Sequence, residues 1–270
     1  MINILMAGDV RVYPGIELAI YSTLTHNKGI NWHIFTMSIT IERGDGLCQD
    51  FIGLQDWHKN KLKKIVTYLD PTSRIVFHDV KDLYIKHFWK NPNEWSGFTP
   101  YAGLRLLADL ELKYTDHILY LDCDVAVQGD ITSMYWEYLS KGYEYCAYVC
   151  PEACDNNGEM VSGVMLMNLK KIRETGFLER ARKNVNTHVY KYYDQDALRD
   201  AGKPYPLPET YGYLEELEKC PYDPIILHFT NRLQPKVYDD KGITYFYRRY
   251  PKLEYVKKGV ELLDTFELQT

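Results

Sequence analysis

The sequence has no long hydrophobic run. Nowhere do about 18 uncharged apolar residues follow one another, so we expect no membrane-spanning helix. The stretch MINILMAGDV at the start lacks a positively charged region, and its apolar run ends at Asp9. A secretory signal peptide needs a charged start and a longer apolar run, so we expect none. These two absences predict a cytoplasmic protein.

A surplus of positive charge is also absent. The chain of 270 residues has a formal net charge of −5, so we expect no nucleic-acid partner. Its six cysteines lack the C-x-x-C spacing typical of metal sites. Three of them lie in CAYVCPEAC (146–154), where Pro151 would break a helix that aligned them. We interpret the cysteines as buried thiols, with a metal or cluster site as the alternative.

What the sequence does contain is an alternation of short apolar runs with amphipathic helical patterns. Hydrophobic residues make up 46% of the chain, enough for a sizeable core. The alternation predicts an α/β fold with a mostly parallel central sheet flanked by helices. We expect strands over residues 2–8, 31–38, 73–80, 118–121, 161–169 and 224–230. We expect helices over residues 14–27, 49–69, 100–112 and 251–266, and a loop over the proline-rich residues 203–224.

One predicted strand ends in two aspartates, in the stretch HILYLDCDVAVQGD. Alternate residues of a strand share a face, so Asp122 and Asp124 would present their carboxylates together while Cys123 points the other way. Two such charges repel unless a cation lies between them, and oxygen ligands suit Mg²⁺ or Mn²⁺. Strand ends are also where α/β folds bind ligands. The alternative is that one aspartate caps a turn and the other forms a salt bridge.

With three later motifs, this stretch resembles the signatures of glycosyltransferase family 8. The motifs are LYLDCDVAVQGDI (119–131), SGVMLMNLKKIRETGF (162–177), YYDQDAL (192–198) and ILHFT (226–230). The resemblance implies a GT-A fold over residues 1–240, with a Rossmann-like sheet that binds a nucleotide sugar. It leaves residues 241–270 as a smaller basic and aromatic helical extension. It also implies Mn²⁺, or Mg²⁺, as cofactor and a UDP-sugar as donor.

The resemblance also implies a metal site. Asp122, Asp124 and His228 would be the ligands that the protein supplies, and the donor diphosphate would complete the shell. Cys123 lies between the aspartates and is included in the nucleotide-sugar site. Without the resemblance, a lone histidine after an apolar run would be interpreted as structural.

Small residues are implied to border the donor. Asp9 would contact the uracil or ribose, and Ala7 and Gly8 would let the base approach the backbone. Ser162 and Gly163 would lie beside the sugar. The alternatives are that Asp9 caps a helix and that the small pair serves strand packing.

The catalytic residues implied by the resemblance are Asp194 and Gln195. Asp194 would contact sugar hydroxyls, and Gln195 would lie near the anomeric carbon. A carboxamide is a poor nucleophile, so we expect a front-side reaction in which both residues stabilise a positive centre at that carbon. The same segment, DQDALRDAG, is also a pattern typical of a capped helix.

Several donor-binding positions depart from the family pattern. Gly103 stands where the family has an arginine, and Arg105, which we include in the donor site, lies about 200° further round an α-helix. Asn231 replaces a glycine, and Gln234 replaces a lysine that contacts the phosphates. These departures leave a weakly active or non-catalytic nucleotide-sugar-binding homologue as an alternative.

Taken together, the sequence predicts a retaining glycosyltransferase. It would move a hexose, glucose or galactose, from a UDP-sugar to a glycan or lipid-linked acceptor in bacterial polysaccharide assembly. A metal-dependent nucleotidyltransferase or phosphoesterase built on the two aspartates is the alternative from another class. The basic and aromatic residues 241–259 suggest peripheral contact with the inner face of the membrane, and a solvated helix face is the other interpretation.

Overall fold

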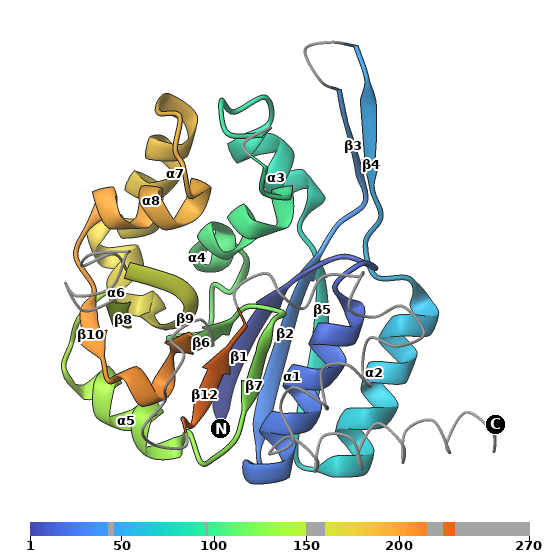
Figure 1. The fold of residues 1–270 in the computed structure, drawn as a ribbon, viewed down its shortest axis with the longest axis vertical. Coiled ribbons are helices and arrows are strands. Elements are labelled where there is room, and N and C mark those ends of the chain that lie inside the picture. The colour runs from blue at the N-terminus through green and yellow to red at the C-terminus, as the bar shows by residue number, and fades with distance from the viewer. Residues whose placement is uncertain (43–45, 95–96, 150–159, 215–223, 230–270) are drawn as a thin grey trace.

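Seven strands form the central sheet of the computed structural model, which describes residues 1–42, 46–94, 97–149, 160–214 and 224–229 (Figure 1). Their order is β10-β8-β9-β6-β1-β2-β5. Only β9 runs antiparallel to its neighbours, so the sheet is mainly parallel, as the sequence predicts. The strands are β1 (Ile2–Ala7), β2 (Ile30–Thr36), β5 (Arg74–Asp79), β6 (His117–Leu121), β8 (Tyr145–Val149), β9 (Met160–Asn168) and β10 (Tyr205–Leu207).

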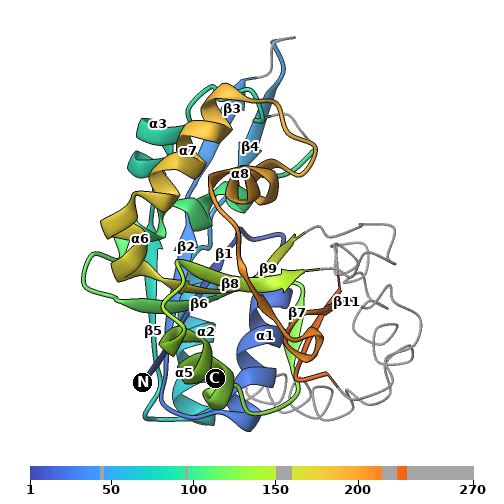
Figure 2. The same ribbon diagram turned by 90° about the vertical axis from the view of Figure 1, so that its left-hand side faces the viewer.

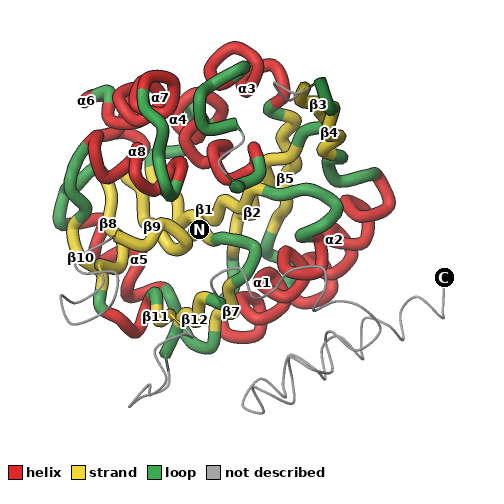
Figure 3. The backbone as a smooth tube through the Cα atoms, turned by 45° about the horizontal axis from the view of Figure 1, so that its top comes forward, coloured by secondary structure: helices red, strands yellow, loops and turns green. Residues whose placement is uncertain are grey.

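Helices cover both faces of this sheet (Figure 3). Strands buried on both faces consist of nearly continuous apolar residues, and residues 118–121 of β6 are all buried. On one face lie α1 (Tyr13–His26), α2 (Asp56–Leu69) and α5 (Thr132–Ser140). On the other lie α3 (Lys81–Phe88), the 3₁₀ helix η1 (Pro100–Leu107), α4 (Ala108–Glu111), α6 (Leu169–Thr175), α7 (Phe177–Thr187) and α8 (Tyr193–Ala201).

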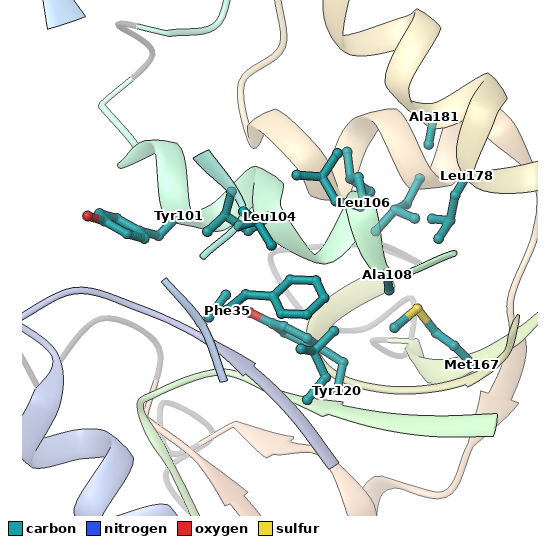
Figure 4. Close-up of a cluster of buried hydrophobic side chains, with 14 of the residues drawn as sticks. Phe35, Tyr101, Leu104, Leu106, Ala108, Tyr120, Met167, Leu178 and Ala181 are labelled. Atoms are coloured by element: carbon teal, nitrogen blue, oxygen red, sulfur yellow. The ribbon is translucent and has the colours of Figure 1, made fainter. Parts of the chain in front are cut away.

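The layer between η1 and the sheet is densely packed with apolar side chains. Leu104 and Leu106 of η1 lie above Phe35 of β2 and Tyr120 of β6 (Figure 4). All four side chains are at most 1% exposed. This packing fixes η1 over the ends of the central strands, where the aspartate motif lies.

The predicted helix over residues 49–69 is wrong over its first seven residues, about two turns. Helix α2 begins only at Asp56, because Gln55 and His58 form a capping box there. The residues before it form β4 (Cys48–Phe51), which pairs with β3 (Ile39–Glu42) as an antiparallel hairpin. The hairpin extends beyond the body of the protein (Figure 1). Phe51, which suited the apolar side of a helix, instead packs against Tyr101 of η1.

The helix predicted over residues 100–112 is divided in two. Its first part is η1, a 3₁₀ helix, and α4 continues it for one turn. The predicted loop 203–224 also contains short elements: β10, the 3₁₀ helix η2 (Glu209–Tyr211) and β11 (Tyr213–Leu214). The prolines there are compatible with β10 because it lies at an edge of the sheet.

A second, three-stranded sheet lies beside α1 (Figure 2). Its order is β11-β12-β7, formed by β7 (Val125–Val127) and β12 (Ile226–His228) with β11. Strand β12 lies within the predicted strand 224–230 and pairs antiparallel with β7. This sheet joins the segment after the aspartate motif to a segment about a hundred residues later.

Several predictions concern residues outside the described ranges. Among those on the fold, they are the helix over 251–266, the extension 241–270, and the arrangement of Cys150 and Cys154. Cys146 is buried, which raises the pKa of its thiol to about 12, but Cys48 is exposed, so the interpretation of the cysteines as buried thiols is wrong for Cys48. Among the described residues, no helix is both long and apolar enough to cross a bilayer.

Candidate active site

Asp122, Asp124 and His228 converge at the end of β6. One ligand atom from each lies within 4.8 Å of the others. His228 Nε2 is 3.2 Å from Asp124 Oδ1 and 3.7 Å from Asp122 Oδ2. Strand β6 ends at Leu121, so the aspartates lie in the turn before β7 and not in a strand. The turn, and not strand alternation, brings the two carboxylates together.

His228 reaches the aspartates because β12 pairs with β7. The register places His228 opposite Val125, directly after Asp124. The amide of Phe229 donates to the carbonyl of Asp124 at 2.9 Å and continues this pairing. Strand pairing therefore places His228 at the site, and the sequence pattern alone does not reveal this pairing.

Gly163 leaves the space that the His228 ring occupies. A Cβ at Gly163 would lie 2.2 Å from His228 Cε1, far inside van der Waals contact. The carbonyl of Gly163 also accepts a hydrogen bond from the amide of Asp122 at 2.8 Å. Gly163, which was expected beside the sugar, thus leaves the space that holds the His228 ring.

The three side chains form a cluster with excess negative charge. Burial alone would lower the pKa of His228, but Asp124 and Asp122 outweigh it, so the pKa is raised. Its Nδ1 is buried and has no hydrogen-bond partner among the described residues. Two carboxylates and one imidazole form a donor set that suits a divalent ion.

Arg105 of η1 connects the aspartate motif to the predicted catalytic segment. Its Nη2 donates to Asp122 Oδ1 at 2.7 Å, and its Nη1 donates to the carbonyl of Ser162 at 2.6 Å. Its Nε lies 3.0 Å from Asp194 Oδ2. Its guanidinium also lies over the Tyr120 ring, 4.0 Å from the centroid. This arginine, only 4% exposed, is the central cation of the site.

The structure explains why Arg105, and not residue 103, faces the strands. The segment is a 3₁₀ helix, so the directions expected for an α-helix do not apply. Gly103 faces α8, where a Cβ would lie 2.6 Å from the Tyr193 hydroxyl. A larger side chain at 103 would therefore collide with α8, while the cation itself is present two residues later.

Tyr120 was not expected at the site. Its hydroxyl donates to Asp122 Oδ1 at 2.7 Å, the same oxygen that Arg105 holds. Oδ1 is thus held by two donors, while Oδ2 is the oxygen turned toward His228. The signal that could have found Tyr120 is its position two residues before Asp122 at the end of a strand.

Asp194 and Gln195 lie in the first turn of α8. Asp194 is buried, and its Oδ2 has no hydrogen-bond partner in the part of the chain that the structure describes, because the Nε–H of Arg105 donates to the carbonyl of Ala102. Burial therefore raises the pKa of Asp194 to about 7, against the opposing effect of Arg105. Gln195 Oε1 accepts from the amide of Ser162 at 3.1 Å.

The residues after β1 lie beside the aspartate motif. Cys123 Sγ donates to the carbonyl of Ala7 at 3.3 Å. A Cβ at Gly8 would lie 2.5 Å from Val12 and 3.2 Å from Cys123 Sγ. Asp9 is 2% exposed and is covered by Arg11, a residue that the motifs did not indicate. Asn231 and Gln234 lie outside the described residues.

The comparisons with known proteins agree with this architecture. The family model "Glycosyl transferase family 8" matches residues 3–235. No curated protein sequence matches the chain. The galactosyltransferase LgtC, solved with donor and acceptor sugar analogues, has a TM-score of 0.67 and 16% identity, over 93% of this chain and 95% of that one.

Two further solved structures are larger proteins. The bifunctional glycosyltransferase WbbM has a TM-score of 0.65 and 14% identity, over 86% of this chain and 46% of its own. The glycosyltransferase GlyE of Streptococcus pneumoniae has a TM-score of 0.62 and 18% identity, over 86% of this chain and 55% of its own. The chain thus spans about half the length of these two proteins. Because the family model covers most of the sequence and these neighbours share its sheet and helices, the chain belongs to glycosyltransferase family 8 and is a glycosyltransferase of the GT-A fold.

Proposed function

We propose that the protein is a metal-dependent retaining glycosyltransferase. It transfers a hexose, glucose or galactose, from a UDP-sugar to a glycan or lipid-linked acceptor. The observation that carries the proposal is that Arg105 joins two sites. It contacts Asp122 of the aspartate–histidine cluster and Asp194 of the catalytic segment, so a diphosphate and its sugar would lie on adjoining groups.

The cluster suits Mn²⁺ better than a purely oxygen-binding ion. Asp122 Oδ2, Asp124 and His228 would hold it, and an imidazole nitrogen is a softer ligand than water or carboxylate. When bound, such an ion neutralises the negative charge that develops on the leaving diphosphate. Arg105 and Tyr120 hold the other oxygen of Asp122, so the ligand oxygen is fixed in direction.

Asp194 would bind the sugar. Its Oδ2 is a buried acceptor that no donor of the described residues reaches, and such a group costs free energy until a donor reaches it. A sugar hydroxyl is a donor of the required kind, and the Arg105 charge 3.0 Å away opposes the rise that burial causes in the pKa of Asp194. A negative group held here also stabilises positive charge at the anomeric carbon.

Gln195 would stabilise the same charge without forming a bond. Its Oε1 accepts from the Ser162 amide at 3.1 Å and from the Ser162 hydroxyl at 3.4 Å, and these two donors orient the carboxamide. A carboxamide oxygen is a weak nucleophile, so a covalent glycosyl intermediate on Gln195 is disfavoured. The acceptor hydroxyl would then attack from the side that the diphosphate leaves, which retains the configuration.

The test is transfer from UDP-glucose and UDP-galactose with Mn²⁺, with the product analysed by NMR. We expect UDP release, a product with the donor's anomeric configuration, and a strong loss of rate in Gln195→Ala. An inverted product contradicts the front-side reaction. Release of phosphate or pyrophosphate with full activity in Gln195→Ala favours a phosphoesterase or nucleotidyltransferase instead. UDP binding without transfer or donor hydrolysis favours a non-catalytic homologue.

We also propose that the protein acts in the cytoplasm, at the inner face of the membrane. The support is the basic and aromatic sequence of residues 241–259, which lies outside the described residues. Sedimentation with anionic lipid vesicles, and its loss when these basic residues are replaced by glutamine, tests the contact. Equal sedimentation with neutral vesicles contradicts it.

A further inference from the structure

The loop after β1 contains an ion pair that the family motifs do not indicate. Asp9 accepts from the amide of Arg11 at 3.0 Å and from its Nε at 2.6 Å, and Nη2 lies 2.5 Å away. The Asp9 side chain is only 2% exposed, whereas the Arg11 side chain is 40% exposed. The guanidinium of Arg11, and not the carboxylate of Asp9, therefore forms the surface of this loop.

The Arg11 guanidinium lies over the ring of Phe51. The Arg11 Cζ lies 5.0 Å from the centroid of the Phe51 ring. Phe51 is itself 5% exposed and packs against Tyr101 at a centroid distance of 6.2 Å. Just after strand β4, which ends at Phe51, Gly53 forms an isolated β-bridge with Asp9 of the loop after β1. Arg11 is thus held at one edge by Asp9 and supported by an aromatic ring.

Such a guanidinium is suited to stacking more than to binding phosphate. Its Nε and Nη2 edge, one of the two edges that could grip a phosphate in a bidentate manner, is already occupied by Asp9. Asp9 also neutralises its charge. A planar cation supported by one aromatic ring remains a good stacking surface for a second planar ring.

The position of Arg11 indicates which ring this is. The loop begins at the end of β1, next to β6, and Cys123 of the aspartate motif contacts Ala7 there. A nucleotide whose diphosphate lies at Asp122 and Asp124 can extend past Gly8 toward Arg11. We infer that Arg11 stacks on the nucleobase of the donor, and that Asp9 positions Arg11 and does not bind the nucleotide itself. This inference rests on the proposed function.

The inference makes Arg11 a specificity-determining residue for the base. It is tested by calorimetry with UDP and, separately, with pyrophosphate, both with Mn²⁺. Pyrophosphate has no base, so it reports the metal and phosphate contacts alone. We expect Arg11→Lys, which keeps the charge and loses the plane, to weaken UDP binding about tenfold and to leave pyrophosphate binding unchanged.

Phe51→Leu is the second variant, because it removes the supporting ring and no charge. We expect a several-fold loss for UDP and none for pyrophosphate. Arg180→Lys is the matched control, since Arg180 also lies over a phenylalanine ring, 5.9 Å from Phe177, but on α7. Thermal unfolding of each variant confirms that it is folded.

The outcomes distinguish a failure of this inference from a failure of the proposed function. Equal UDP binding in wild type and Arg11→Lys overturns the inference, and so does an equal loss for UDP and pyrophosphate, which would mean a phosphate contact. Wild-type protein that binds pyrophosphate as tightly as UDP also overturns it. Binding of neither ligand by the wild type contradicts the proposed function, and the inference fails with it.

Discussion

The imidazole of His228 lies directly over the α-carbon of Gly163, in the space that any side chain at 163 would fill. The contact joins β9 of the central sheet to β12 of the second sheet. It makes the position of the predicted third metal ligand depend on the absence of one methyl group.

We therefore expect Gly163→Ala to displace His228. A Cβ 2.2 Å from the ring cannot be accommodated without moving it. Mn²⁺ affinity, measured by calorimetry, should fall at least tenfold. Gly129→Ala is the control, because its Cβ would make an ordinary 3.4 Å contact with Ile225. Unchanged Mn²⁺ affinity in a folded Gly163→Ala protein would show that His228 is not a ligand.

Tyr120→Phe removes one of the two donors that fix Asp122 Oδ1. We expect Mn²⁺ affinity to fall about tenfold, since partners that orient a ligand typically contribute that much. Tyr135→Phe is the matched control. It removes another buried tyrosine hydroxyl, which donates to His117 at the other end of β6. An equal effect of the two variants on Mn²⁺ affinity would contradict the positioning role.

Arg105→Gln leaves two carboxylates in a buried site without their cation. We expect the free energy of unfolding, measured in EDTA, to fall by about 3 kcal/mol. Arg173→Gln, which removes a more exposed pair with Asp116, should change it by less than about 1 kcal/mol. If the two variants lose the same amount, the buried charges at Asp122 and Asp194 are not held by Arg105.

The pH dependence of stability should include a contribution from His33 on β2. Burial, and then the neighbouring charge of His78, lower the pKa of His33 to about 4. Its Nδ1 lies 3.1 Å from His78 Nε2, and His78 Nδ1 lies 2.9 Å from Glu111. The folded state resists protonation, so stability is complete above the unfolded pKa of about 6.5 and falls toward pH 4.

The expected loss over that window is about 3 kcal/mol. It is measured as the difference in unfolding free energy between wild type and His33→Gln from pH 7 to pH 4. The glutamine keeps a hydrogen-bonding group beside His78. A difference that does not change with pH would contradict the lowered pKa of His33.

Local patterns predicted the elements whose burial is continuous. Strands β1, β2 and β6 were recognised because apolar runs in a parallel sheet are uninterrupted. The hairpin β3–β4 was missed because it is short and Phe51 also fits a helical face. The 3₁₀ geometry of η1 depends on packing against the sheet, which the sequence of residues 100–107 does not display.

The candidate site was likewise predicted only in part from the sequence. The aspartate motif was evident in the sequence, although a turn and not a strand brings its carboxylates together. The approach of His228 depends on pairing between β7 and β12, which are about a hundred residues apart. The motifs indicated Asp9 and not Arg11, because only the exposure of the two side chains shows that Arg11 faces outward.

The central claim is that Asp122, Asp124 and His228 hold a divalent ion that binds the donor diphosphate. Mn²⁺ binding, followed by electron paramagnetic resonance with and without UDP, tests it most directly. We predict that wild-type protein binds Mn²⁺, that UDP tightens this binding, and that Asp122→Asn with Asp124→Asn abolishes both effects. Mn²⁺ and UDP binding that persists undiminished in the folded double variant would contradict the claim.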